Sequence, residues 1–143
     1  MAKMRLCLPA LIIASFAIGL GAQIPDLEGR IAFVSDRDGS QNIWVMELKS
    51  SAFYRITDFP DASGINGVAF PRWSPDGKSV AFNGGRGRDP EFCSGEIFIV
   101  NANPYDPSFK AITQVTSYPD SLIEASMPVW DPIDPNILYY VEY

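Results

Sequence analysis

The chain has 143 residues, of which 47% are hydrophobic and 20% charged, the composition of one ordinary globular domain rather than of a disordered or fibrous segment. Its 17 acidic residues outnumber the 11 basic ones, which argues against nucleic acid as a partner. Histidine is absent and no Gly-x-Ser-x-Gly elbow occurs, so a Ser-His-Asp triad, a Cys-His dyad and a His-Glu-x-x-His zinc motif are excluded within these residues. We therefore expect no catalytic residue, cofactor or metal here.

Residues 1–22 have the pattern of a secretory signal peptide. A basic start precedes an apolar run over about 6–20, expected to form a signal helix, and small residues then predict cleavage after Gly21 or Ala22. The run is short for the roughly 20 residues of a membrane helix and contains Pro9; an uncleaved anchor is the alternative. A periplasmic or secreted location follows, with no membrane contact apart from the leader.

Past the leader, the apolar runs are short, rich in β-branched and aromatic residues, and separated by Gly, Pro, Asp and Ser. No stretch of helix length has a 3.6-residue periodicity. The pattern predicts an all-β fold with nine strands of ordinary length, at residues 30–35, 42–47, 54–57, 68–73, 79–83, 96–101, 111–116, 127–130 and 137–141.

These strands recur along the chain in the same order, with spacings between 49 and 59 residues. The matched runs are 31–33 with 80–82, 43–45 with 97–99, 55–57 with 114–116, and 71–73 with 128–130. Four short strands per period of roughly 40 to 60 residues are typical of a propeller blade, a small antiparallel sheet that needs neighbours to bury both faces. We therefore expect residues 23–143 to form a partial β-propeller of about two to two and a half four-stranded antiparallel blades, with copies at about 26–67, 68–126 and 127–143.

The run Ser74-Pro75-Asp76-Gly77 is predicted to be the hairpin turn between the first two strands of a blade. Pro75 presets its own φ near −65°, and Gly77 accepts the positive φ that closes the turn. Trp73 and Trp130, each just before such a turn, are expected to pack between adjacent blades. The residues predicted to define the repeat are Pro71, Trp73, Pro75, Asp76, Gly77, Pro128 and Trp130.

The run "PRWSPDGKSVAF" at 71–82, with "GRIAFVSDRDGSQNIWVMELKSSAFYRITDFP" at 29–60, resembles the WD-like β-propeller repeat of TolB-type proteins. The resemblance covers essentially residues 26–143, with departures from the family pattern at 84–95 and 131–136, and the family's separate N-terminal α/β domain has no counterpart. It implies a module that binds or scaffolds protein partners in the cell envelope. TolB-type proteins are periplasmic members of the Tol-Pal system that contact a peptidoglycan-associated lipoprotein and take part in bacteriocin import.

Propellers close with about four to eight blades, so we expect these residues to be the N-terminal part of a longer protein. Remaining blades of the same chain, or further copies of it as the alternative, would complete the ring. The rival functional interpretation is an N-terminal propeller gate of a larger hydrolase, such as a prolyl oligopeptidase-type serine peptidase, whose catalytic domain is not in this chain.

The long connection at 84–95 is the best candidate for a partner-binding loop, because binding residues concentrate on loops carried by rigid scaffolds. Its candidate contact residues are Arg86, Arg88, Phe92 and Cys93. A phosphate-binding glycine loop is the less favoured alternative, since Pro90 and a strand follow "GGRGRD" where a helix should begin. Loss of the leader, which contains Cys7, leaves Cys93 as a free thiol, a link to another chain, or half of a pair with a residue beyond this sequence.

Asp36, Asp38 and Glu47 have part of the spacing of a calcium-binding loop. Trp44 and Val45 lie between them in a predicted strand, so a hairpin turn is the preferred interpretation of residues 35–39.

Overall fold

The computed structural model describes residues 28–58, 67–85, 95–118 and 123–143. The predicted leader and its signal helix lie outside these ranges. Within them the chain is all-β, and every strand pairing is antiparallel. No helix in the described part of the chain has the length and apolar character that a membrane span needs.

The strands form three sheets, each built from strands consecutive in the sequence. The first sheet contains β1 (Arg30–Ser35), β2 (Asn42–Glu47) and β3 (Phe53–Arg55). The second contains β4 (Val68–Trp73), β5 (Ser79–Gly84), β6 (Glu96–Asn101) and β7 (Ile112–Gln114). The third contains β8 (Ala125–Trp130) and β9 (Leu138–Glu142). The sequence prediction of an all-β chain with nine short strands is confirmed for these residues.

Four predicted strands have the predicted bounds, and the others shift by one or two residues at one or both ends. β3 and β7 are the most shortened, because a threonine side chain takes over the pairing where each strand ends. β8 begins at Ala125, two residues earlier than predicted, since Ala125 and Ser126 pair with Glu142 and Val141 of β9.

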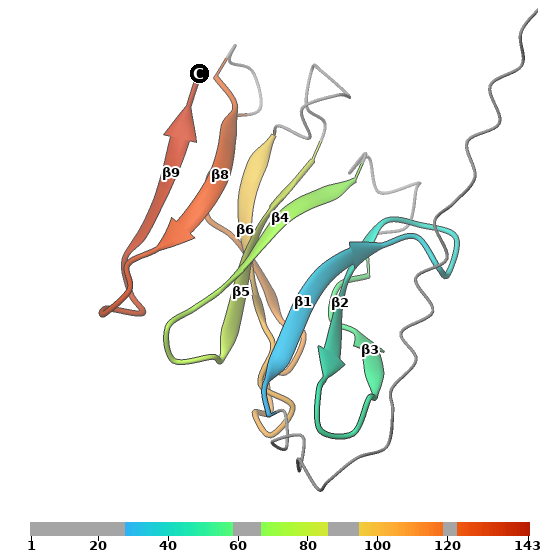
Figure 1. Ribbon diagram of the computed structural model, residues 1–143. Helices are drawn as coiled ribbons and strands as arrows, with labels where there is room; N and C mark the ends of the chain where they lie inside the picture. The colour runs from blue at the N-terminus through green and yellow to red at the C-terminus, as the bar shows by residue number, and fades with distance from the viewer. Residues whose placement is uncertain (1–27, 59–66, 86–94, 119–122) are drawn as a thin grey trace, which may run out of the picture.

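The second sheet lies between the other two (Figure 1). Its β5 and β6 side chains Val80, Phe82, Phe98 and Val100 form the buried core together with Ile43 and Val45 of the first sheet, among others. Phe82 is fully buried, and its ring stacks on Phe98 with centroids 5.6 Å apart. Because side chains alternate between the faces of a strand, Ala81 and Asn83 point to the opposite face, toward the third sheet.

Asn83 joins the second and third sheets. Its side-chain amide is fully buried and donates to the backbone O of Ala125 at 3.0 Å, while its Oδ1 accepts from the backbone N–H of Met127, also at 3.0 Å. One carboxamide thus satisfies two backbone groups of β8, one of them the carbonyl of the fully buried Ala125.

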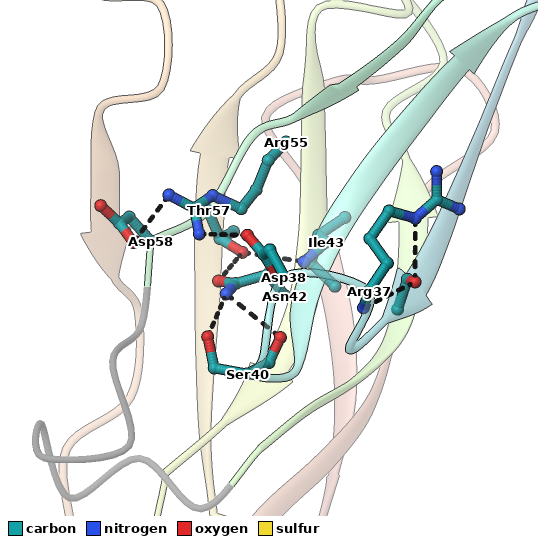
Figure 2. A network of polar contacts seen from close by, with 9 residues as sticks. Arg37, Asp38, Ser40, Asn42, Ile43, Arg55, Thr57 and Asp58 are labelled. Atoms are coloured by element: carbon teal, nitrogen blue, oxygen red, sulfur yellow. Dashed lines mark hydrogen bonds and ion pairs between the residues drawn. The ribbon is translucent and has the colours of Figure 1, made fainter.

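The first two sheets share one hydrogen-bond arrangement, in which a threonine hydroxyl bonds to the start of a neighbouring strand. Figure 2 draws the one in the first sheet. The Thr57 hydroxyl accepts from the backbone N–H of Ile43 at 2.8 Å and donates to Asn42, the first residue of β2. Thr116 has the same role in the second sheet, where it accepts from Ile97 at 2.9 Å and donates to Glu96. The matched runs of the sequence therefore correspond in three dimensions.

A β-bulge interrupts the first strand of both the second and the third sheet. The pairing shifts between Ala69 and Arg72 in β4 and between Ser126 and Val129 in β8. Each bulge contains a residue with positive φ, Phe70 at 51° and Met127 at 54°, followed by the predicted repeat prolines Pro71 and Pro128. Proline lacks an N–H to pair, so the bulge accommodates it without breaking the rest of the ladder.

Candidate partner-binding site

The loop predicted to bind a partner is placed only at its ends. Arg86, Arg88, Phe92 and Cys93 lie outside the described residues. The connection leaves the second sheet after β5 and returns at Gly95, whose backbone O accepts from the N–H of Ala125 at 2.8 Å.

The turn at 74–77 connects β4 to β5, as predicted. The N–H of Gly77 donates to the O of Ser74 at 2.9 Å, and Gly77 has a φ of 67°, which glycine adopts without strain. Asp76 Oδ1 accepts from the Ser74 hydroxyl at 2.6 Å and from the N–H of Lys78 at 3.1 Å. These hydrogen bonds, the one from Ser74 above all, hold the pKa of Asp76 below its ordinary value.

The lowered pKa of Asp76 predicts a stabilising effect that disappears in acid. Its pKa in the folded chain is below the unfolded value of 3.8, so the ionised carboxylate stabilises the fold above that pH, and the effect is lost as pH falls below it. Asp76→Asn should lower the free energy of unfolding by about 1 kcal/mol or less at pH 6, the range for exposed charges, and have no effect near pH 2. Urea unfolding at both pH values tests this; an equal loss at both would contradict it.

Trp73 and Trp130 both lie between neighbouring sheets. The Arg30 guanidinium of β1 lies over the ring of Trp73, 4.5 Å from its centroid, and reaches the second sheet by donating to the backbone O of Ala102 at 2.9 Å and to that of Gly77. Trp130 of β8 donates through Nε1 to the backbone O of Arg72 in β4 at 3.0 Å. Each tryptophan therefore makes a contact across the junction between its own sheet and the preceding one.

A groove of about 350 Å³ opens where the second and third sheets meet. It is lined by Arg72, Trp73, Pro75, Val129, Trp130, Asp131 and Pro132. Five of the seven predicted repeat residues lie in this lining or in the adjoining turn. Because the β4–β5 turn and Gly84 lie at opposite ends of β5, the groove and the point at which the chain leaves β5 lie at opposite ends of that strand.

Asp131 is the acidic residue of the groove. Its Oδ1 accepts from the backbone N–H groups of Ile133 at 2.9 Å and Asp134 at 3.0 Å, and its Oδ2 accepts from the Tyr139 hydroxyl at 3.1 Å. The two backbone hydrogen bonds are the main cause of a pKa below the ordinary value, so the Asp131 carboxylate is negatively charged at neutral pH, in a lining that also contains Arg72.

The candidate calcium residues do not come together as a site. The N–H of Gly39 donates to the backbone O of Asp36 at 2.9 Å, the hairpin turn that was preferred, and Asp38 forms an ion pair with Arg55 (Figure 2). Arg55 also pairs with Asp58 at 3.1 Å. Among the residues that the structure describes, no group of three or more Cys, Asp or Glu side chains is placed to hold a metal ion.

The face of the first sheet that points away from the second is aromatic. Phe33 and Trp44 pair across β1 and β2, and Phe53 of β3 meets Phe33 edge-on with centroids 6.2 Å apart. The Arg37 guanidinium lies about equally far from the three rings, at 4.7 to 5.1 Å from their centroids. Phe53 is 48% exposed, so this aromatic face is partly open to solvent.

Comparison with protein-family models gives no match, and comparison with curated proteins gives no significant match. Its fold and site define an all-β protein of three antiparallel sheets packed in a row, with a groove between the second and third.

Proposed function

We propose that the three sheets are consecutive blades of a TolB-like, WD-like β-propeller that is exported to the periplasm or secreted, and that binds or scaffolds protein partners of the cell envelope. The observation that carries the proposal is that successive sheets meet in the same way: β4 lies against β1 and β2, and β8 lies against the matched strands β5 and β6. Phe82 and Phe98 face the first sheet and are buried by it. Phe33 and Trp44 occupy the matched positions of the first sheet.

The partly exposed aromatic face of the first sheet supports the same proposal, because its Phe33 and Trp44 match the Phe82 and Phe98 that the second sheet buries against the first. The position of β1 at the edge of the first sheet also supports the propeller proposal. In the second sheet, β4 pairs with the strand that corresponds to β1, and the Arg72 carbonyl of β4 accepts from Trp130. Trp73 corresponds to Trp130, yet its buried Nε1 has no partner among the described residues. A further strand beside β1 would supply that acceptor.

A binding role also fits the charge and composition of the chain. Ring-shaped stacks of small sheets present loops and grooves at their two ends, and such positions on rigid scaffolds are where binding residues concentrate. No triad can be built without histidine, and the described groove has the aromatic and charged lining of a recognition site rather than paired catalytic groups.

Site-specific photo-cross-linking tests this function. A photoreactive amino acid is placed at Ile133, which is 88% exposed beside the groove, at Phe92 in the predicted loop, or at Lys49 as an exposed control. In cells that express the full chain, we expect a leader-free product outside the cytoplasm. We also expect an adduct with a second protein from Ile133 or Phe92 but none from Lys49.

Adducts only between copies of the chain, or equal adducts from all three positions, would contradict a specific binding module. Retention of the intact leader in the cytoplasm would contradict export.

A further inference from the structure

The two inter-sheet tryptophans occupy matched positions, 57 residues apart, but among the described residues a cation lies over the ring of Trp73 alone of the two. At the junction of the first and second sheets, the Arg30 guanidinium stacks on Trp73 at 4.5 Å and donates to two backbone carbonyls. The chain thus contains one arginine site at this position of the repeat, in which a cation–π contact and carbonyl acceptors act together.

The matched position at the next junction lacks the arginine. Arg30 is the first residue of β1, and the spacing of 49 that relates β1 to β5 places Ser79 there, the first residue of β5. A serine side chain is too short to reach Trp130, and no cation lies over the Trp130 ring in the described part of the chain. The groove of about 350 Å³ opens beside this ring.

Two further features favour a positively charged occupant. Trp130 is held in place, because its Nε1 donates to the Arg72 carbonyl at 3.0 Å, so its ring does not need to be ordered on binding. The Asp131 carboxylate lies in the same lining, and the chain as a whole has a net charge of −6. Arg72 also lines the groove, but its Nη1 donates to the Pro71 carbonyl at 3.1 Å. Like-charge repulsion from Arg72 places a bound cation on the Trp130 and Asp131 side.

We propose that this groove binds an arginine side chain of a partner protein, with the guanidinium stacked on Trp130 and paired with the Asp131 carboxylate. The Arg30 contact with Trp73 is the internal precedent for the interaction. This inference depends on the proposed binding function in one respect only, namely that the bound arginine belongs to a protein. The groove, Trp130 and Asp131 belong to this chain.

The test uses the full chain and a small probe, so it is independent of export and of any envelope partner. The chain has three tryptophans, Trp44, Trp73 and Trp130, whose indole N–H signals can be followed separately by NMR. N-acetyl-arginine methylamide is titrated against the matched uncharged probe, N-acetyl-citrulline methylamide. We expect the Trp130 signal to shift with arginine, with about tenfold weaker binding of citrulline.

Three variants define the site. Asp131→Asn should weaken binding of the arginine probe about tenfold. Trp130→Phe, which removes the reporting indole and is therefore measured by isothermal titration calorimetry, should weaken it less, because a smaller ring remains. Ser79→Arg should block the probe by supplying the guanidinium from the chain itself, as Arg30 does on Trp73. Ser79→Gln is the matched control for side-chain length and should bind like the unmodified chain.

Equal affinity for the two probes would overturn the proposal. So would unchanged binding by Ser79→Arg, or a shift confined to Trp44 or Trp73. These results leave the envelope-binding function untouched, whereas the absence of cross-links from Ile133 and Phe92 would count against that function and not against the arginine site.

Discussion

Replacement of Phe82 by alanine is expected to lower the free energy of unfolding of the chain by about 3–5 kcal/mol, the range for a fully buried phenylalanine. Phe82 has no exposed surface, stacks on Phe98, and belongs to the core that joins the first and second sheets. Truncation therefore removes buried apolar surface and leaves a cavity between two sheets. Urea unfolding followed by tryptophan fluorescence measures the loss.

Phe33→Ala is the matched control, because Phe33 has the same place in the first copy of the repeat but lies on the partly exposed aromatic face. Its loss should be smaller, about 1–2 kcal/mol, since its neighbours are Phe53 and the Arg37 guanidinium rather than a second sheet. Equal losses for the two variants would contradict the prediction and would indicate that another sheet covers this face in solution.

Replacement of Asn83 by leucine is expected to cost about 2–5 kcal/mol, because the Ala125 carbonyl, which is buried, and the Met127 N–H, which is partly buried, both lose their partners. Asn83 supplies the donor to the Ala125 carbonyl and the acceptor for the Met127 N–H. The loss should be local to the contact between the second and third sheets. Hydrogen exchange of the Met127 amide, which should become faster, provides a readout that a general loss of stability would not single out.

Asn101→Leu is the control for this variant. Asn101 also lies on the second sheet and makes two side-chain hydrogen bonds, with Ser108 at 2.7 Å and with the N–H of Asn103 at 2.9 Å. Both partners belong to the β6–β7 connection, where water can replace the lost hydrogen bonds, so the cost should be about 1 kcal/mol or less. A similar cost for both variants, with unchanged exchange at Met127, would show that Asn83 does not join the sheets.

Local sequence pattern predicted the strands and the turn well, because both depend on neighbouring residues. The run from Val68 to Trp73 has the β-branched and aromatic content of a strand, and Pro75 and Gly77 have the backbone preferences of the turn that follows. The internal repeat added longer-range information: Thr57 and Thr116, matched by spacing alone, make the same hydrogen bond to matched isoleucines.

The groove was not predicted, because it depends on what two sheets place side by side. Trp73 and Trp130 were identified as packing residues, but their different surroundings follow from the change of Arg30 to Ser79 across the repeat. Comparison of the copies position by position, rather than by strand, would have pointed to that change. The positive φ of Phe70 and Met127 could not be predicted from the sequence either, because it arises from the bulge and not from a preference of the side chain.

Within each described sheet, paired strands are consecutive in the sequence, so only short loops separate them. The entropy lost on closing such loops is small, and formation of each sheet does not wait for residues far along the chain. A nascent chain leaving the ribosome or an export channel could therefore acquire these sheets one at a time. Phe82 and Phe98 would be buried as soon as the second sheet packs against the first. This order of folding shortens the time for which a partly folded chain exposes its large apolar side chains to aggregation.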